Sequence, residues 1–254
     1  MPYADSDGVR IHYRIEGSGP PLVLNHWSLG SSRGWFEYGF VERLADGFTV
    51  IAHDVRGHGK SDKPADPQAY RLDLRVKDVI AVLDDLGVKR SFFYGYSMGG
   101  WIGFGVSHLV PDRFHAVAIG GAHPYAQSMA GLRDLLKIGV DRGAEAFIEQ
   151  MEGSAEGFLR AHEPEWMTAD FTAQWAAALD RESMEETLPT IDCPCLIVAG
   201  TEDPVFDEAG RASRAIRGAR FESLAGLDHG GALMRSDVVV PLLREFFQKE
   251  GMAF

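Results

Sequence analysis

The side chain best placed for chemistry is Ser97, at the centre of the glycine-rich pentapeptide Gly95–Gly99. This G-x-S-x-G pattern lies between an apolar run typical of a buried strand, 91–95, and a segment typical of a helix, 100–110. A tight strand-to-helix turn strains the backbone, holds the serine hydroxyl clear of the sheet and leaves room only for glycine two positions away on either side. We therefore predict that Ser97 is a nucleophile; the alternative is a chance glycine-serine turn.

His229 is the histidine best placed to activate this serine. A serine hydroxyl is a weak nucleophile until a base removes its proton. His229 lies in a loop directly after the last expected strand, 221–224, and loops at the carboxyl ends of strands form the sites of α/β sheets. It also follows Ser97 in the chain order nucleophile, acid, base. We predict His229 as the general base; the alternative is a histidine in a surface loop.

The acid that orients this base is predicted to be Asp203. It lies three residues after Gly200, at the end of an expected strand, and so can accept a hydrogen bond from the imidazole. Glu202 and Asp207 are competing candidates, although Asp207 is better suited to capping the helix expected after it. The predicted catalytic triad is Ser97, Asp203 and His229.

Met98 supplies the first predicted oxyanion donor. Its backbone N–H lies at the start of the helix that follows the serine, where the helix dipole favours negative charge. A tetrahedral intermediate formed on the serine would place its negative oxygen near this amide. The sequence therefore predicts acyl transfer rather than a metal-dependent reaction, and no cofactor or metal is expected, because no metal-ligand spacing of the H-E-x-x-H type occurs.

The segments that must position these residues alternate between the apolar pattern of strands and that of helices. A chain of 254 residues with 45% hydrophobic residues suits one large domain, or one domain with an insertion. Strands alternating with helices predict a mainly parallel sheet covered on both faces. Between residues 122 and 189 the alternation stops and the pattern is helical, which indicates an insertion on the sheet. The expected strands are 9–15, 21–25, 48–52, 91–95, 114–119, 195–199 and 221–224, and the expected helices 70–86, 100–110 and 238–248.

Charge and composition exclude several classes of partner. The formal net charge of −12 disfavours binding to nucleic acid or to an anionic membrane surface. No apolar run is long enough to span a bilayer, and the first residues do not resemble a signal peptide. Cys193 and Cys195 are too close together for an unstrained disulfide and are expected to be reduced, which favours a cytoplasmic protein.

Together these motifs resemble the α/β-hydrolase superfamily over nearly the whole chain. Residues 25–35 look like the family's loop after an early strand, and 54–61 look like its D-x-R-G-x-G-x-S turn. The resemblance implies a mostly parallel sheet of about eight strands flanked by helices. It also implies a core formed by 1–121 and 190–254, with a helical cap at 122–189. The chain looks most like the small capped serine esterases, enol-lactonases, cofactor-free haloperoxidases and C–C bond hydrolases.

The resemblance implies a second oxyanion donor, the N–H of Ser28, with one departure from the family pattern. The family has glycine after the histidine of this loop, and here the residue is Trp27, which could narrow the pocket or shift the loop. The entrance is expected to be apolar, without an arginine to bind an anionic substrate. Five residues are predicted to line the substrate pocket: His26, Trp27, His123, Trp166 and Trp175.

The function implied is cleavage of a carboxylic ester or lactone through an acyl-enzyme on Ser97. Alternatives with the same triad are a C–C bond hydrolase, a perhydrolase, or a slow or non-catalytic receptor for a small ligand. Epoxide hydrolases are disfavoured, because they place aspartate where Ser97 stands. The expected partner is an apolar small-molecule ester or lactone, and the sequence leaves open whether the protein is a monomer or a homodimer.

Overall fold

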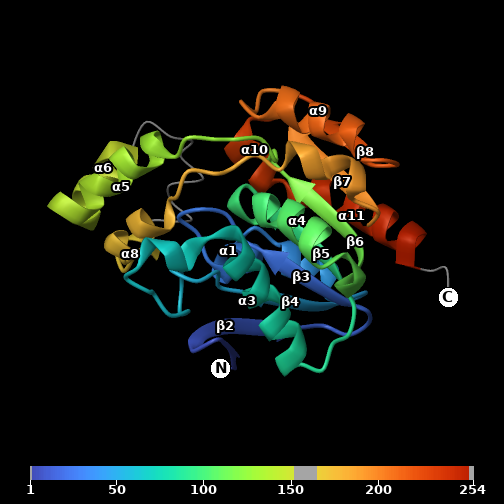
Figure 1. The fold of residues 1–254 in the computed structure, drawn as a ribbon, viewed down its shortest axis with the longest axis horizontal. Coiled ribbons are helices and arrows are strands. Elements are labelled where there is room, and N and C mark those ends of the chain that lie inside the picture. Colours follow the sequence, from blue (N-terminus) through green and yellow to red (C-terminus); the bar gives the residue numbers. More distant parts are fainter. Residues whose placement is uncertain (1, 152–164, 252–254) are drawn as a thin grey trace.

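The computed structural model describes residues 2–151 and 165–251 and contains one eight-stranded sheet (Figure 1). The strand order is β1-β2-β4-β3-β5-β6-β7-β8. The pairs β1–β2 and β2–β4 are antiparallel, and all the others are parallel. The strands are β1 Tyr3–Ser6, β2 Val9–Glu16, β3 Pro21–Asn25, β4 Thr49–His53, β5 Ser91–Tyr96, β6 Phe114–Gly120, β7 Cys195–Gly200 and β8 Arg220–Leu224.

Helices cover both faces of the sheet. The α-helices are α1 Ser32–Glu37, α2 Phe40–Leu44, α3 Leu72–Asp85, α4 Met98–Leu109, α5 Ala130–Arg142, α6 Ala144–Met151, α8 Phe171–Ala177, α9 Phe206–Ala215, α10 His229–Met234 and α11 Ser236–Gly251. Short 3-10 helices lie at η1 Pro67–Tyr70, η2 Pro111–Arg113 and η3 Glu185–Thr190. One apolar core lies between the sheet and α3, α4 and α9, and a second lies between the sheet and α1, α2 and α11.

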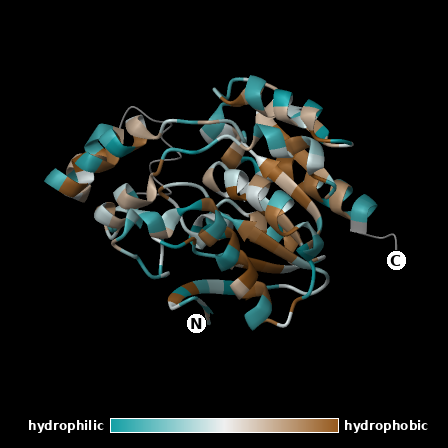
Figure 2. Ribbon diagram, in the orientation of Figure 1, coloured by the Kyte–Doolittle hydropathy of each residue, from teal (hydrophilic) through white to brown (hydrophobic). Residues whose placement is uncertain are grey.

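The central strands are apolar on both sides, as a sheet between two helical layers requires. In β5 the side chains alternate: Phe93 packs in the core under α3 and α4, whereas Phe92, Tyr94 and Tyr96 pack in the core under α11. Figure 2 shows the brown, apolar strands in the middle of the molecule and teal residues on the outer helices. Every residue of β5 is buried up to the end of the strand. Ser97, which follows it, is therefore attached to a well-packed part of the sheet.

The segment between β6 and β7 contains α5, α6 and α8, which lie to one side of the sheet (Figure 1). It has its own small apolar cluster, which includes Leu136, Phe147 and Phe171. Gln127 and Arg181 form an isolated antiparallel bridge where the segment leaves and rejoins the core. We keep the name cap for 122–189.

The fold class predicted from the sequence is confirmed, and the expected strands and helices are present with ends shifted by a few residues. The sequence reading missed β1, which pairs with β2 at the edge of the sheet, and the short helices α1, α2 and α10. These elements are four to six residues long, too short to show a clear period.

Candidate active site

The turn between β5 and α4 has the geometry that a serine nucleophile needs. Ser97 has φ 54° and ψ −110°, a strained conformation for a residue with a side chain, and α4 begins at Met98. The two flanking glycines are required by space. A Cβ on Gly99 would lie 2.0 Å from the carbonyl oxygen of Asn25, and one on Gly95 would lie 2.1 Å from the carbonyl oxygen of Gly99. The strain is therefore held by close backbone packing of β3, β5 and α4.

His229 and Asp203 are hydrogen-bonded to each other. His229 Nδ1 lies 2.8 Å from Asp203 Oδ2, and the other carboxylate oxygen accepts the N–H of Val205 at 3.0 Å. A carboxylate can only accept, so Nδ1 carries the proton and Nε2 is left as an acceptor. The Asp203 side chain is 1% exposed and that of His229 is 40% exposed. The pair thus consists of a buried, fixed acid and a base that faces the solvent-accessible cavity.

Two further contacts fix the position of this histidine. The hydroxyl of Tyr96 donates to the backbone oxygen of His229 at 2.6 Å. The loop before His229 crosses the end of β7 so closely that a Cβ on Gly200 would lie 2.0 Å from the carbonyl oxygen of Leu227. Asp228 then caps α10 by accepting the N–H of Gly231 at 2.6 Å. The glycine at the end of β7 therefore lets the loop before His229 lie directly against this strand end.

The competing acids lie away from His229. Glu202 and Asp207 are both exposed, and neither has a hydrogen bond to the histidine ring among the described contacts. The expectation that Asp207 caps the next helix was wrong. The N-cap of α9 is Val205 and Asp207 lies within the first turn, where its charge complements the helix dipole.

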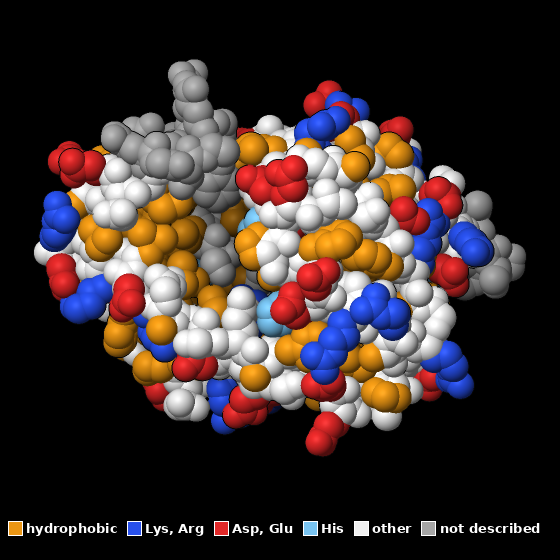
Figure 3. Space-filling model, turned by 90° about the horizontal axis from the view of Figure 1, so that it is seen from above, with side chains coloured by type: hydrophobic (Ala, Val, Ile, Leu, Met, Phe, Trp, Pro, Cys, Tyr) orange, Lys and Arg blue, Asp and Glu red, His pale blue; other side chains and the backbone are white. Residues whose placement is uncertain are grey.

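Ser97, Asp203 and His229 line one cavity of about 650 Å³ between the cap and the core. Figure 3 shows apolar side chains gathered where the cap faces the core. Of the other predicted residues, Ser28, Trp27 and His123 line the same cavity, and Met98 lines a smaller neighbouring one. The remaining described residues around the large cavity are Gly121, Ala122, Gln127, Met129, Leu132, Arg181, Pro204, Val205, Asp228, Gly230 and Leu233.

Trp27 is accommodated without blocking the cavity. Its ring packs edge-on against Trp35 and stacks on Tyr38, with ring centres 5.2 and 5.7 Å apart. Space for the ring comes from two glycines: a Cβ on Gly30 would lie 2.6 Å from Trp27 Nε1, and one on Gly34 would lie 2.4 Å from Trp27 Cη2. The indole is thus directed into the core under α1, which explains how this loop carries tryptophan where the family has glycine.

His26 is buried behind the loop and lines neither of these cavities, so its assignment to the pocket was wrong. The N–H of Val55 donates to His26 Nε2 at 3.0 Å, so Nδ1 carries the proton and donates to the backbone oxygen of Trp27 at 2.8 Å. Burial lowers the pKa of His26 to about 4, which keeps the ring neutral. His26 therefore fixes the backbone that leads to Ser28.

The cap tryptophans are also placed differently from the prediction. Trp166 is fully buried, and its Nε1–H donates to the backbone oxygen of Leu29 at 2.8 Å. Trp175 is 40% exposed and lies on neither cavity. Leu29 itself has a left-handed φ of 65° and packs its side chain in the cap's apolar cluster. Trp166 thus joins the cap to the residue after the proposed oxyanion donor Ser28.

His123 lies on the cavity as predicted for a lining residue. The N–H of Tyr125 donates to its Nδ1 at 3.2 Å, so the neutral ring carries its proton on Nε2. Burial lowers the pKa of His123 below its ordinary value, which favours this neutral form. The ring also stacks on Tyr125.

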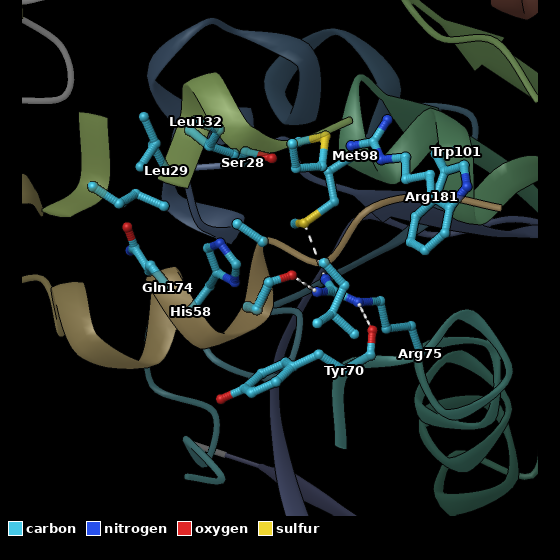
Figure 4. A pocket seen from close by; sticks show the side chains of 15 residues that line it. Ser28, Leu29, His58, Tyr70, Arg75, Met98, Trp101, Leu132, Gln174 and Arg181 are labelled. Carbon is cyan, nitrogen blue, oxygen red and sulfur yellow. Dashed lines mark hydrogen bonds between the residues drawn. The ribbon is translucent and has the colours of Figure 1, made fainter. Parts of the chain in front are cut away.

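Arg181 is the pocket residue that the sequence reading missed, and the expectation of a pocket without an arginine was wrong. It lines both the large cavity and a smaller one of about 20 Å³ (Figure 4). In the sequence it lies between Asp180 and Glu182, and no motif marks it as a pocket residue. Its place in the pocket depends on the backbone bridge to Gln127, which is distant in the sequence and so could not be seen in a local pattern. Arg75, Trp101 and Gln174 also line the smaller cavity.

The part of the chain that the structure describes contains no cluster of three or more His, Cys, Asp or Glu side chains that could hold a metal ion. Within the same residues, no helix is both long and apolar enough to cross a membrane. Cys193 and Cys195 are buried free thiols, and burial raises the pKa of each to about 12.

A mainly parallel sheet with a strained serine after β5 and a histidine after β8 defines the class of an α/β hydrolase. The family comparison agrees. Residues 20–192, about two thirds of the chain, match the model of the family described as alpha/beta hydrolase fold. The chain therefore belongs to the α/β-hydrolase fold family.

Individual proteins extend the likeness along the chain. It is 28% identical to a non-heme chloroperoxidase of Streptomyces lividans, covering 95% of this chain and 97% of that protein. It is 30% identical to bifunctional epoxide hydrolase 2 of Sus scrofa over 64% of this chain, but spans only 31% of that longer protein. The solved structure of an enol-lactonase from Burkholderia xenovorans LB400 superposes with a TM-score of 0.85 and 26% identity, covering 97% of this chain and all of the other. These relatives support hydrolase activity.

Proposed function

We propose that this chain is a serine hydrolase that cleaves a carboxylic ester or a lactone through an acyl-enzyme on Ser97. The observation that carries the proposal is the hydrogen bond of 2.8 Å between His229 and Asp203, on the same cavity as the strained serine. Hydrolases of this kind need a nucleophile, an oriented base and a cavity that admits the substrate.

In the proposed reaction His229 Nε2 takes the proton of Ser97 Oγ as that oxygen attacks the carbonyl carbon. The carbonyl oxygen becomes negative and accepts the N–H of Met98, at the start of α4, and the N–H of Ser28. The tetrahedral intermediate collapses, the C–O bond to the alcohol breaks, and His229 gives its proton to the leaving oxygen. Water then repeats the sequence on the acyl-enzyme and releases the acid. Asp203 stabilises the imidazolium formed in each half.

The enol-lactonase likeness supports a lactone or ester substrate, and the chloroperoxidase likeness keeps perhydrolysis as a second candidate. In perhydrolysis hydrogen peroxide replaces water at the acyl-enzyme and the product is a peracid. Peracid formation from acetate and peroxide, compared with ester hydrolysis by the same preparation, separates the two. A receptor would instead bind once, form one covalent event per site and turn over slowly.

The test replaces Ser97 with alanine and measures hydrolysis of p-nitrophenyl butyrate. We expect Ser97→Ala to lose at least about a thousandfold in kcat, because the nucleophile is removed while the cavity remains. Ser213→Ala is the matched control: this buried serine of α9 only donates to the backbone oxygen of Gly210 and should leave kcat unchanged. Wild-type turnover by a correctly folded Ser97→Ala variant would overturn the proposal. A fluorophosphonate adduct on Ser97, located by mass spectrometry, would support it.

A further inference from the structure

Arg181 is held in a fixed position over the proposed active site. The segment that carries it pairs with Gln127 through two backbone hydrogen bonds, of 3.0 and 2.9 Å, at the neck of the cap. Its side chain reaches the wall shared by the large cavity and the small one. Because this large cavity is the one lined by Ser97 and His229, any substrate held there faces the guanidinium.

The charge of Arg181 has no carboxylate partner among the described residues. Its contacts are a hydrogen bond to Gln127 Oε1 at 3.0 Å and the face of the Trp101 ring, 5.0 Å from the guanidinium carbon. Other arginines of the chain are paired with acids: Arg133 with Asp180, and Arg56 with Asp78. Arg181 is partly buried and its charge is not paired with a carboxylate, so an anion that enters the cavity is favoured at this point.

Burial lowers the pKa of Arg181 to about 10, so the side chain keeps its charge at neutral pH. Arg75 lies behind it in the small cavity and adds positive potential. Three of the five N–H donors of Arg75 are used by the backbone oxygens of Tyr70 and Ala177, at 2.8 Å each, and by the sulfur of Met98 (Figure 4). Of these two arginines, only Arg181 lines the large cavity, so it is the one that can bind a ligand there.

Two neutral polar groups on the small cavity that Arg181 lines also lack hydrogen-bond partners within the described part of the protein. Trp101 Nε1 and Gln174 Oε1 are both buried without a hydrogen-bond partner, and both residues line the small cavity. The large cavity is also lined by two acidic residues: Asp203, which is bonded to His229, and Asp228, which precedes it in the chain. A negatively charged substrate group is therefore repelled by these two carboxylates and attracted by Arg181.

We propose that Arg181 binds a carboxylate on the acyl part of the substrate, so that the enzyme acts on half-esters or lactones of dicarboxylic acids. This inference rests on the proposed serine hydrolase function. The cavity of about 650 Å³ has room for a substrate that carries both a scissile carbonyl and a carboxylate. The same arginine gives the C–C bond hydrolase alternative an anion-binding group, so the test uses simple esters.

The test compares p-nitrophenyl hydrogen adipate with its methyl ester, in which the terminal carboxylate is replaced by a neutral methyl ester. We expect the wild-type enzyme to prefer the free acid in kcat/KM, mainly through a lower KM. Arg181→Gln should lower kcat/KM for the acid about tenfold to a hundredfold and leave the methyl ester within about twofold, since one charge-assisted contact is lost. Arg181→Lys should lie between, because lysine keeps the charge without the planar fork.

Arg211→Gln is the matched control, since Arg211 also lies over an aromatic ring, that of Tyr125, but is exposed and paired with Glu185. It should change neither substrate. Equal losses on both esters in Arg181→Gln would reduce Arg181 to a structural role at the cap neck, and a wild-type enzyme without preference for the acid would overturn the proposal. Adipate binding to Ser97→Ala, measured by calorimetry, tests the anion site without turnover. If Ser97→Ala binds adipate and still cleaves the esters at the wild-type rate, the anion site is supported and the proposed serine hydrolase mechanism is the part that fails.

Discussion

Glu165 gives a prediction whose size and sign can be worked out from its surroundings. It belongs to the cap and forms a hydrogen bond with Ser31 of the loop before α1. Burial, with added repulsion from Asp54 and Glu37, raises the pKa of Glu165 from 4.5 to about 7, although Ser31 and Arg33 oppose the shift. The folded state therefore binds a proton more tightly than the unfolded chain does.

Because the folded pKa is raised, the free energy of unfolding falls as the pH rises from about 4.5 to 7 and then stays constant. Compared with a carboxyl group whose pKa is the same in both states, Glu165 lowers the free energy of unfolding by at most roughly 3 kcal/mol at pH 8 and by about 1 kcal/mol at pH 5. Glutamine cannot ionise and keeps an oxygen for the Ser31 hydroxyl. Glu165→Gln should therefore stabilise the protein more at pH 8 than at pH 5, by up to roughly 2 kcal/mol.

Urea unfolding followed by tryptophan fluorescence at both pH values measures this difference. Glu149→Gln is the control, because Glu149 is an exposed carboxylate on α6 and the same substitution should leave the pH dependence unchanged. If Glu165→Gln shifts stability by the same amount at pH 5 and pH 8, the reasoning is refuted. In that case the carboxylate is as well solvated in the folded protein as in the unfolded chain.

Two further predictions concern the triad and its turn. Asp203→Asn should lower kcat on p-nitrophenyl butyrate by about 10³ to 10⁴ with little change in KM, because asparagine no longer fixes the His229 tautomer; a change of less than tenfold would argue against the pair. Gly99→Ala should prevent the turn from forming and lower Tm by several degrees, since its Cβ would lie 2.0 Å from a backbone oxygen, whereas Gly131→Ala on α5 has open space and should be neutral or stabilising in thermal melts.

The proposed triad could be assigned from the sequence because each member follows the end of a strand within a local pattern. Ser97 is defined by the glycines two positions away, and Asp203 and His229 by the strand ends that precede them. The relevant information lies within about ten residues of each side chain. The same holds for the strands in the centre of the sheet, whose apolar runs are uninterrupted, whereas the short edge strand β1 was missed.

The pocket could not be predicted in the same way, since it depends on contacts between distant segments. Arg181 reaches the cavity only because its backbone pairs with Gln127, 54 residues earlier. From the sequence Trp27 could narrow the pocket or shift its loop, whereas in the structure its ring occupies space left by Gly30 and Gly34. Trp166 has the apolar type and helical spacing of a pocket residue, yet it packs inside the cap. Periodicity shows that a side chain is buried, but not against which partner.

The hydrogen bond from Trp166 to the backbone oxygen of Leu29 limits how this protein can be re-engineered or diversify. A cap attached only at its two ends could be exchanged for another as a separate module. Here the cap also contacts the loop that contains Ser28, because the Leu29 side chain packs among the cap residues. A transplanted cap without a donor at that position would leave the loop unsupported. Changes of specificity that arrive by cap exchange must therefore bring the matching loop with them.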